Sequence, residues 1–343
     1  MKISISAKSV LSKLLGFAGI PETTIRKRSG KQYLILMYHR ILPSGLAKPW
    51  TQAGMYVDPD TFEMHIRYLK ENFQVVSLSE KFSSSQTIGN TRSIRPFCIL
   101  TFDDGWKDFF KNAYPVLKRN QVPATVFLPT GYIGTDDWFW TDRLARFLAS
   151  ATPPTKPGLS GTKPDNSLAG MIAGLKGGYE ERLETAILLL KNRSDKEVKE
   201  VIEGLEDRGN IGTIPAIPMF LNWEEVREMV RSGLVSFGSH THNHRILVHL
   251  NEGEVREELA LSKKILLREE VVDPSFIPFC YPNGNLNERI ARMVREAGYH
   301  AAVSTEDGWN DGDAFPFELK RLAIHQDMTA SREMFGCRVA DIL

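Results

Sequence analysis

The fold of this chain is decided by residues Phe97–Trp106, which read FCILTFDDGW. The run Phe97–Phe102 is apolar except for one threonine, and two carboxylates and a glycine follow it. An apolar run of this length predicts a strand buried on both faces, as in a parallel sheet. Such strands carry chemistry just beyond their carboxyl ends. Asp103 and Asp104 stand at that point, although a DDG turn is also an ordinary way to end a strand.

The same order of strand, polar residues and helix recurs along the chain. Further strands are predicted at Tyr33–Met37, Gln74–Leu78, Pro123–Leu128, Leu234–Gly238, Phe276–Tyr281, His300–Ser304 and Leu319–Ile324. Helices are predicted from Asp58 to about Asn72 and at Lys107–Asn120, Trp223–Ser232, Glu252–Glu269 and Leu286–Ala297. This alternation predicts an α/β fold with right-handed crossovers. In a closed parallel barrel, the carboxyl ends of all the strands would converge on one face.

The alternation is interrupted in the middle of the chain. Residues Pro153–Ser167 are rich in Pro, Gly, Ser and Thr, which predicts a loop. Leu168–Leu205 is predicted to form two helices. We therefore interpret about 141–218 as a mainly helical insertion, with a substrate-shaping lid and plain packing bulk as its two possible roles. The whole chain divides into an N-terminal lead-in, 1–32, and the barrel, 33–343, which contains this insertion.

The composition is that of a soluble globular protein without a nucleic-acid footprint. Lys and Arg number 43 and Asp and Glu number 42, a balance that leaves no basic excess. The three cysteines, Cys98, Cys280 and Cys337, are scattered, which favours buried free thiols and a reducing compartment over a disulfide scaffold.

The N-terminal lead-in contains an amphipathic segment, MKISISAKSVLSKLLGFAGI. Its apolar residues follow helical spacing, but Lys13 interrupts the unbroken apolar core that a signal peptide needs. Three alternatives stay open: a helix packed on the protein's own body, a helix resting on a membrane surface, and a cleaved signal. No apolar run approaches the ~20 residues that span a bilayer. These features favour a cytoplasmic location, or peripheral contact with the inner membrane.

Polar residues gather beyond the predicted strand ends. Besides the two aspartates they are His39, His240, His244, Asn283, Asp307 and His325. Two imidazoles four residues apart, in the run HTHNH, can reach one metal ion if the backbone makes a helical turn. Position 241 is not the glutamate of an HExxH site, so the base must come from elsewhere, and Asp103 is the candidate. Two imidazoles and a carboxylate suit a borderline divalent ion, and His242 between them is expected to pack or hydrogen-bond.

Three of these stretches together resemble the NodB-homology polysaccharide deacetylases, a carbohydrate esterase type. They are TFDDG at 101–105, HTHNH at 240–244 and FCYPNG at 279–284, flanked by YHR at 38–40 and PATVFL at 123–128. The resemblance covers roughly 33–134 and 223–324 and leaves the insertion outside. It implies a distorted (β/α) barrel and a hydrolase of carbon–nitrogen bonds that removes acetyl groups from N-acetylated sugars.

The resemblance also implies roles for single residues. Asp104, His240 and His244 would hold a divalent metal ion, with zinc expected and cobalt or nickel as alternatives. Asp103 would take the proton from the attacking water, and the backbone N–H of Asn283 would help stabilise the oxyanion. His325 would protonate the departing amine, with a purely structural histidine as the alternative. The further candidates for substrate or oxyanion contacts are His39, Tyr281 and Trp309, and His39 could instead hydrogen-bond a neighbouring loop.

Two positions depart from the family's pattern. Cys280 stands where the third motif often begins with an arginine that orients the base, and Arg321 could supply that charge from the last strand. The last motif reads AIH where a leucine-x-histidine is usual.

Indoles that could stack on sugar rings are Trp106, Trp138, Trp140 and Trp309.

Three functional hypotheses follow. The first is a metal-dependent N-deacetylase of a bacterial-type polysaccharide or glycolipid, with an N-acetylated glycan as partner and no nucleic acid. The second is a metal hydrolase of another amide or ester. The third is a glycan-binding relative without catalysis. The sequence does not specify the glycan, the physiological metal or the oligomeric state.

Overall fold

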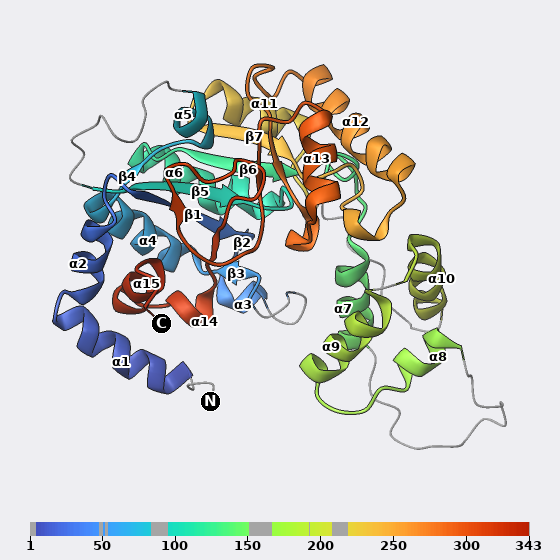
Figure 1. The fold of residues 1–343 in the computed structure, drawn as a ribbon. Coiled ribbons are helices and arrows are strands. Elements are labelled where there is room, and N and C mark those ends of the chain that lie inside the picture. Colours follow the sequence, from blue (N-terminus) through green and yellow to red (C-terminus); the bar gives the residue numbers. More distant parts are fainter. Residues whose placement is uncertain are drawn as a thin grey trace. The chain divides into compact units, whose positions relative to one another are not determined.

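The computed structural model describes residues 5–47, 51, 54–83, 95–150, 167–191, 193–207 and 219–342. The chain divides into two compact units, which Figure 1 shows as ribbons. Unit 1 comprises Met1–Ser44, Gly54–Thr135 and Pro218–Leu343, and unit 2 comprises Gly45–Ala53 and Asp136–Ile217.

A parallel sheet forms the centre of unit 1 (Figure 1). Its strands lie in the order β1 (Gln32–Tyr38), β5 (Phe97–Phe102), β6 (Ala124–Leu128), β7 (Val235–Ser239), β8 (Pro278–Cys280) and β9 (Ala301–Val303). All five pairings between these neighbours are parallel. The predicted strand Phe97–Phe102 is confirmed to the residue, and it is buried because it has a parallel neighbour on each side and helices on the sheet.

The sheet closes on itself through the segment 319–323. Leu319 bridges Val303 of β9, and β11 (Leu322–Ala323) pairs in parallel with Leu36 and Met37 of β1. Two short strands, β4 (Gln74–Val75) and the antiparallel β10 (Asn310–Asp311), add to β5 and β1. The result is the distorted (β/α) barrel that the sequence resemblance implies.

Alternate strand residues fill the barrel interior. The enclosed cluster takes in Tyr33 and Ile35 of β1, Ile99 of β5, Phe127 of β6 and Cys280 of β8. Since successive strand residues point to opposite faces, the residues between them pack outward against helices.

The helices and short elements of unit 1 complete the description. They are α1 (Ile5–Phe17), α2 (Ile20–Lys27), α4 (Pro59–Asn72), α5 (Leu78–Ser83), α6 (Tyr114–Asn120), α11 (Trp223–Arg231), α12 (Glu252–Arg268), α13 (Glu288–Glu296), α14 (Gln326–Thr329), α15 (Arg332–Val339), the strands β2 (Arg40–Ile41) and β3 (Tyr56–Val57), and 3-10 turns at Leu247–His249 and Pro282–Gly284. The short helix α3 (Ser44–Ala47) lies at the boundary of the units. Asn222 caps α11 with a capping box, as predicted.

Two local features differ from the sequence prediction, and a third lies almost wholly outside the described residues. The helix expected at Lys107–Asn120 begins with a π-helical segment, Phe109–Ala113, because Pro115 has no N–H for the regular i→i−4 bond. The strand expected at Gln74–Leu78 stops at Val75, and Leu78 begins α5 instead. The predicted loop Pro153–Ser167 lies outside the described residues except for Ser167, which caps α8.

Unit 2 is helical, with α7 (Trp140–Ser150), α8 (Leu168–Ala173), α9 (Tyr179–Leu190) and α10 (Asp195–Glu206). Three helices instead of two lie between Leu168 and Glu206, because Gly177, at φ 109°, and Gly178 separate α8 from α9. Apolar side chains from all four helices form one core. Arg143 of α7 donates to the Glu206 carboxylate of α10, which ties these helices together.

The three cysteines are free and buried, as predicted. Within the part of the chain that the structure describes, no helix combines the length and the apolar character needed to cross a bilayer.

Candidate active site

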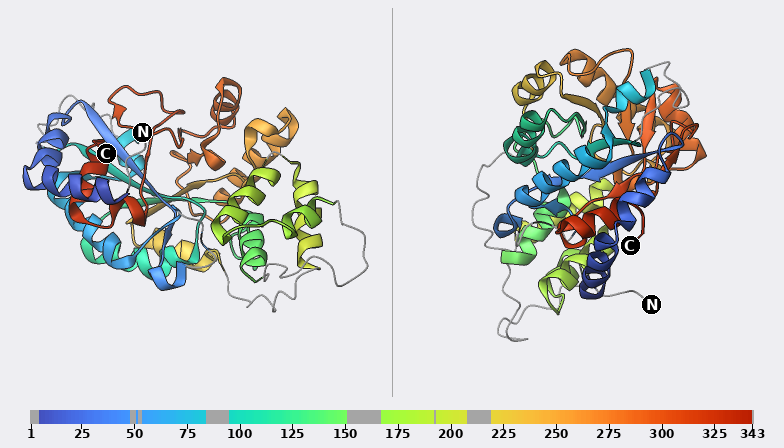
Figure 2. Two further views of the ribbon diagram at one scale, coloured as in Figure 1. Left: turned by 90° about the horizontal axis from the view of Figure 1, so that it is seen from below. Right: turned by 90° about the vertical axis from the view of Figure 1, so that its left-hand side faces the viewer.

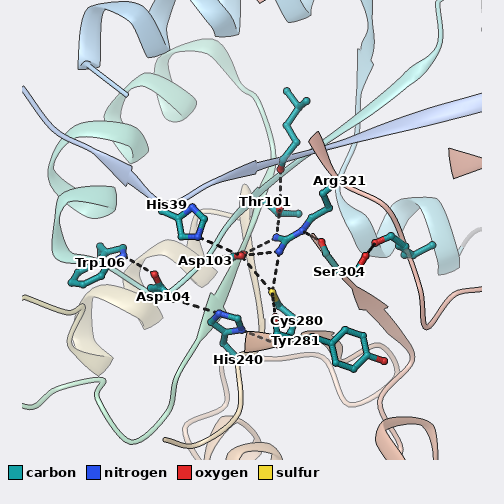
Figure 3. Close-up of polar contacts among 12 residues, drawn as sticks. His39, Thr101, Asp103, Asp104, Trp106, His240, Cys280, Tyr281, Ser304 and Arg321 are labelled. Carbon is teal, nitrogen blue, oxygen red and sulfur yellow. Dashed lines mark hydrogen bonds and ion pairs between the residues drawn. The ribbon is translucent and has the colours of Figure 1, made fainter. Parts of the chain in front are cut away.

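The site begins where β5 ends (Figure 3). The Asp103 N–H donates to the Tyr38 carbonyl at 3.0 Å, so Asp103 still continues the pairing with β1. Asp104 then takes a left-handed conformation with φ 73°, and the chain turns away. Gly105 follows at φ 63°, where a Cβ would come within 2.8 Å of the Leu128 side chain. This turn buries both carboxylates and directs them to different partners.

The Asp104 carboxylate faces two imidazoles. Its Oδ1 lies 3.4 Å from His240 Nε2 and 3.2 Å from His244 Nε2. Its other oxygen, Oδ2, accepts a hydrogen bond of 3.0 Å from the Trp106 indole N–H. The carboxylate is therefore held by one oxygen, and the other oxygen is directed at both rings.

The tautomer of His240 is determined by its second partner. His240 Nδ1 lies 2.8 Å from the Cys280 carbonyl oxygen, which can only accept a hydrogen bond. In the neutral ring the proton is thus on Nδ1, and the lone pair of Nε2 is directed at Asp104. Carbonyl oxygens hold metal-binding histidines in this way.

The three side chains fit a divalent metal ion. One ligand atom from each of Asp104, His240 and His244 lies within 4.8 Å of the other two. Two imidazole nitrogens and one carboxylate oxygen suit zinc, cobalt or nickel and leave positions open for other ligands.

The segment that carries the two histidines is not helical, so the imidazoles meet without the helical turn that the spacing alone would require. Thr241 and His244 have φ values of 63° and 57°, and these left-handed residues bring the imidazoles together. Glu258 of α12, only 3% exposed, accepts hydrogen bonds from the backbone N–H groups of His242 and Asn243. The His242 ring hydrogen-bonds Thr130, in line with the expectation that this residue packs or hydrogen-bonds between the two candidate ligands.

Glu258 was not among the residues predicted from the sequence, although its position carried a signal. The buried residues of α12 include Val255, Glu258, Leu259 and Ser262, which recur at helical spacing. A glutamate on the buried face of an amphipathic helix needs partners, and the histidine loop supplies them.

The second carboxylate, Asp103, forms a bidentate ion pair with Arg321. The distances are 2.7 Å from Nη1 to Oδ1 and 2.8 Å from Nη2 to Oδ2. The remaining guanidinium donors reach the Ser304 carbonyl, the Thr101 hydroxyl and the Cys280 sulfur, at 2.7, 3.0 and 3.2 Å. Arg321 is fully buried, and all five of its N–H groups have an acceptor. Arg321 thus lies beside Cys280 and supplies the charge that the third motif lacks, as the sequence suggested.

This pairing sets the charge of Asp103. Burial alone would raise the pKa of Asp103, but the Arg321 guanidinium holds this pKa below its ordinary value. His39 lies on the other side, with Nε2 4.0 Å from Asp103 Oδ2, and burial lowers the pKa of His39. Asp103 is therefore ionised at neutral pH, between a cation and an imidazole.

Asp103, His240 and Cys280 form a second group with metal-ligand atoms. The Arg321 guanidinium contacts two of its members, Asp103 and Cys280. A fixed positive charge at this distance opposes a second cation, so the Asp104 group is the better metal site.

Two of the predicted substrate residues do not lie at the site. Tyr281 is buried, and its hydroxyl donates to the Phe317 carbonyl at 2.9 Å, because the alternation along β8 directs Cys280 inward and Tyr281 toward α12 and α13. Trp309 is also buried and donates to the Val339 carbonyl. Its neighbour Asn310 pairs with Tyr33 at the start of β1, the end opposite to His39.

The other residues beyond strand ends have local partners. Asp307 accepts a hydrogen bond from Arg338 of α15. Asn283 has φ 55° and contacts Asn285. His325 follows β11, precedes α14 as its N-cap residue and contacts Asp327. The Ile324 N–H donates to the Met37 carbonyl near the carboxyl end of β1. His325 therefore comes just beyond this end of β1, as His39 does.

The chain is similar in sequence to known polysaccharide deacetylases. The family profile described as "Polysaccharide deacetylase" matches residues 92–163 and 177–302, a region that includes Asp103, Asp104, His240 and His244 but not Arg321. The chain is 22% identical over 298 residues to a putative polysaccharide deacetylase, YxkH, of Bacillus subtilis, covering 87% of this chain and 73% of that protein. It is 29% identical over 123 residues to the poly-beta-1,6-N-acetyl-D-glucosamine N-deacetylase of Staphylococcus aureus, covering 33% of this chain and 41% of that protein.

Solved structures share the fold. IcaB from Ammonifex degensii matches with a TM-score of 0.56 and 19% identity, covering 90% of this chain and 98% of that one. The deacetylase PplD of Streptococcus pyogenes, in complex with acetate, matches with a TM-score of 0.54 and 20% identity, covering 87% and 94%.

Proposed function

Since the chain belongs to the polysaccharide deacetylase family and is thus a hydrolase of non-peptide carbon–nitrogen bonds, we propose that it is a metal-dependent enzyme that removes N-acetyl groups from the sugars of a bacterial-type polysaccharide or glycolipid. The observation that carries this proposal is the pairing of two differently held carboxylates. Asp104 faces two imidazole nitrogens, while its neighbour Asp103 is clamped in the ionised form by Arg321.

The metal site supports the proposal through its donor atoms. Asp104, His240 and His244 would hold the ion, and the Cys280 carbonyl and the Trp106 indole orient two of these ligands. When bound, a divalent ion would polarise the acetyl carbonyl and make water a better nucleophile.

The residues of this chain would supply the remaining chemistry. Asp103 accepts the proton of the attacking water, and Arg321 keeps this base ionised and correctly oriented. The backbone N–H of Asn283 donates to the oxyanion. His325 protonates the departing amine. His39 lies close to Asp103 and would line the space that the substrate occupies.

The direct test is acetate release from N-acetylglucosamine oligomers. Metal-free protein should be inactive, and added Zn²⁺ or Co²⁺ should restore release. Asp103→Asn should retain the metal, because the Asp104 group is intact, and lose turnover. Undiminished acetate release by this variant would contradict the assignment of the base.

The same assay separates the two other hypotheses. Metal-dependent cleavage of short acyl amides without cleavage of the oligomers would indicate a different amide or ester substrate. Saccharide binding with bound metal and no acetate release would indicate a glycan-binding relative.

A further inference from the structure

The helix α1 presents large apolar side chains to solvent. Val10, Leu14 and Phe17 are 61%, 66% and 97% exposed. Their spacing of four and three residues places them on one face of the helix. Ile20, which begins α2, is also exposed. We call these four residues the apolar stripe.

The opposite face of α1 packs on the protein. Ser12 is buried, and its carbonyl lies 4.0 Å from the Cys337 sulfur of α15. Gly16 lies against Glu333 of α15, where a Cβ would come within 2.8 Å of the Glu333 side chain. Figure 2 shows α1 beside α15.

This arrangement changes one sequence expectation. The helix does pack on the protein's own body, with Ser12 and Gly16 close to α15. Leu11 and Leu15 of the expected apolar face are half-buried, whereas Val10 and Leu14 of that face are exposed. Since Gly16 permits the close approach to α15, turning the apolar stripe inward would lose that contact. The stripe therefore needs another partner or stays in water at a cost.

The charges on α1 and α2 are mainly basic. Lys13 lies on α1 between Val10 and Phe17, and Arg26 and Lys27 end α2, all three exposed. The segment 5–31 contains six basic residues, Lys8, Lys13, Arg26, Lys27, Arg28 and Lys31, and one acidic residue, Glu22, which accepts a hydrogen bond from Tyr68. The whole chain is almost neutral, so this excess is local.

We propose that the exposed face of α1 and α2 docks on the surface of an anionic lipid bilayer. The apolar stripe enters the interface between headgroups and acyl chains, and Lys13, Arg26 and Lys27 contact lipid phosphates. A second copy of this chain is a poorer partner, because two such surfaces would bring like charges together. This inference does not depend on the proposed deacetylase activity.

The test is flotation of the full chain with vesicles. The protein should float with vesicles of phosphatidylglycerol and phosphatidylcholine and much less with phosphatidylcholine alone, and added salt should weaken binding. Phe17→Ser should lower partitioning at least about tenfold, because a whole aromatic side chain stays in water. Neutralising Lys13 or Lys27 with glutamine should lower partitioning about fivefold each.

A matched control separates the stripe from general surface hydrophobicity. Phe315→Ser removes a second exposed phenylalanine of unit 1, which is 50% exposed and lies outside α1 and α2, and should leave flotation unchanged. Flotation of Phe17→Ser equal to that of the original chain would overturn the proposal. So would a concentration-dependent dimer, seen by sedimentation velocity without vesicle binding and lost in Phe17→Ser, which would assign the stripe to a second copy.

Discussion

Replacing Arg321 with methionine removes the only cation that contacts Asp103 among the described residues and leaves the carboxylate buried. Methionine fills part of the space of the arginine stem but has no N–H group. The substitution therefore removes five hydrogen-bond donors at once, from the Asp103 carboxylate, Thr101, Cys280 and the Ser304 carbonyl.

The expected cost is large because both partners are buried. Removing one member of a buried ion pair costs about 3–5 kcal/mol, a substantial part of the ~5–15 kcal/mol that stabilises a typical domain. With the guanidinium gone, burial is the main remaining influence, and the pKa of Asp103 should rise above its ordinary value. Turnover should fall, and the acid limb of its pH profile should move to higher pH.

Urea denaturation of the metal-free protein, followed by tryptophan fluorescence, measures the free energy of unfolding. In the original chain the lowered pKa of Asp103 contributes stability above the ordinary carboxyl pKa of ~3.9, and this contribution is lost as the pH falls through the folded-state pKa. In Arg321→Met the raised pKa reverses the sign, so the penalty should shrink as the pH falls from neutral. The double variant Asp103→Asn/Arg321→Met should recover part of the loss, because it leaves no unpaired charge.

Arg227→Met serves as the control. Arg227 pairs with Glu269 at 2.9 Å but is 39% exposed, so this substitution should cost no more than about 1 kcal/mol. Should Arg321→Met cost no more than Arg227→Met and keep full acetate release, the role of the buried pair in holding the base would be refuted.

Three further predictions concern the proposed metal site. Trp106→Phe keeps the stacking on Phe220 but removes the hydrogen bond to Asp104, so metal affinity should fall about tenfold. Competition with a chelator measures this affinity, and an unchanged Kd would contradict the role of the indole. Glu258→Gln should lower both metal affinity and the free energy of unfolding, the latter by about 1–3 kcal/mol, because the backbone N–H groups of His242 and Asn243 lose a carboxylate acceptor. If neither quantity changed, the loop that carries the histidines would hold its shape without Glu258. Burial would lower the pKa of His240, but Cys280 and the Asp104 carboxylate raise it well above its ordinary value of ~6.5, so metal affinity should rise with pH. The stability that this histidine gives the metal-free protein is complete below the ordinary pKa and is lost as the pH rises through the raised pKa. Calorimetric titration and denaturation over a pH series would test both directions.

Local sequence patterns were sufficient for the framework. The apolar run before Asp103 predicted a buried parallel strand, because a short continuous run suits few other environments. The polar residues beyond the strand ends indicated which face carries the chemistry. The resemblance to the deacetylase family then grouped Asp104 with His240 and His244, and their donor atoms do lie together.

Only the tertiary structure decided which side chains complete the site. Arg321 and Asp103 are 218 residues apart, and they meet because the segment 319–323 closes the barrel between β9 and β1. No periodicity within a window of sequence reports such a closure. The direction of Tyr281 likewise depends on which face of β8 packs outward. The position of Trp309 depends on where the chain returns to pair with the start of β1. The sequence thus determined the strands and the kind of chemistry at their ends, while long-range packing determined the partners of each charge, because burial and pairing depend on neighbours that are distant in the chain.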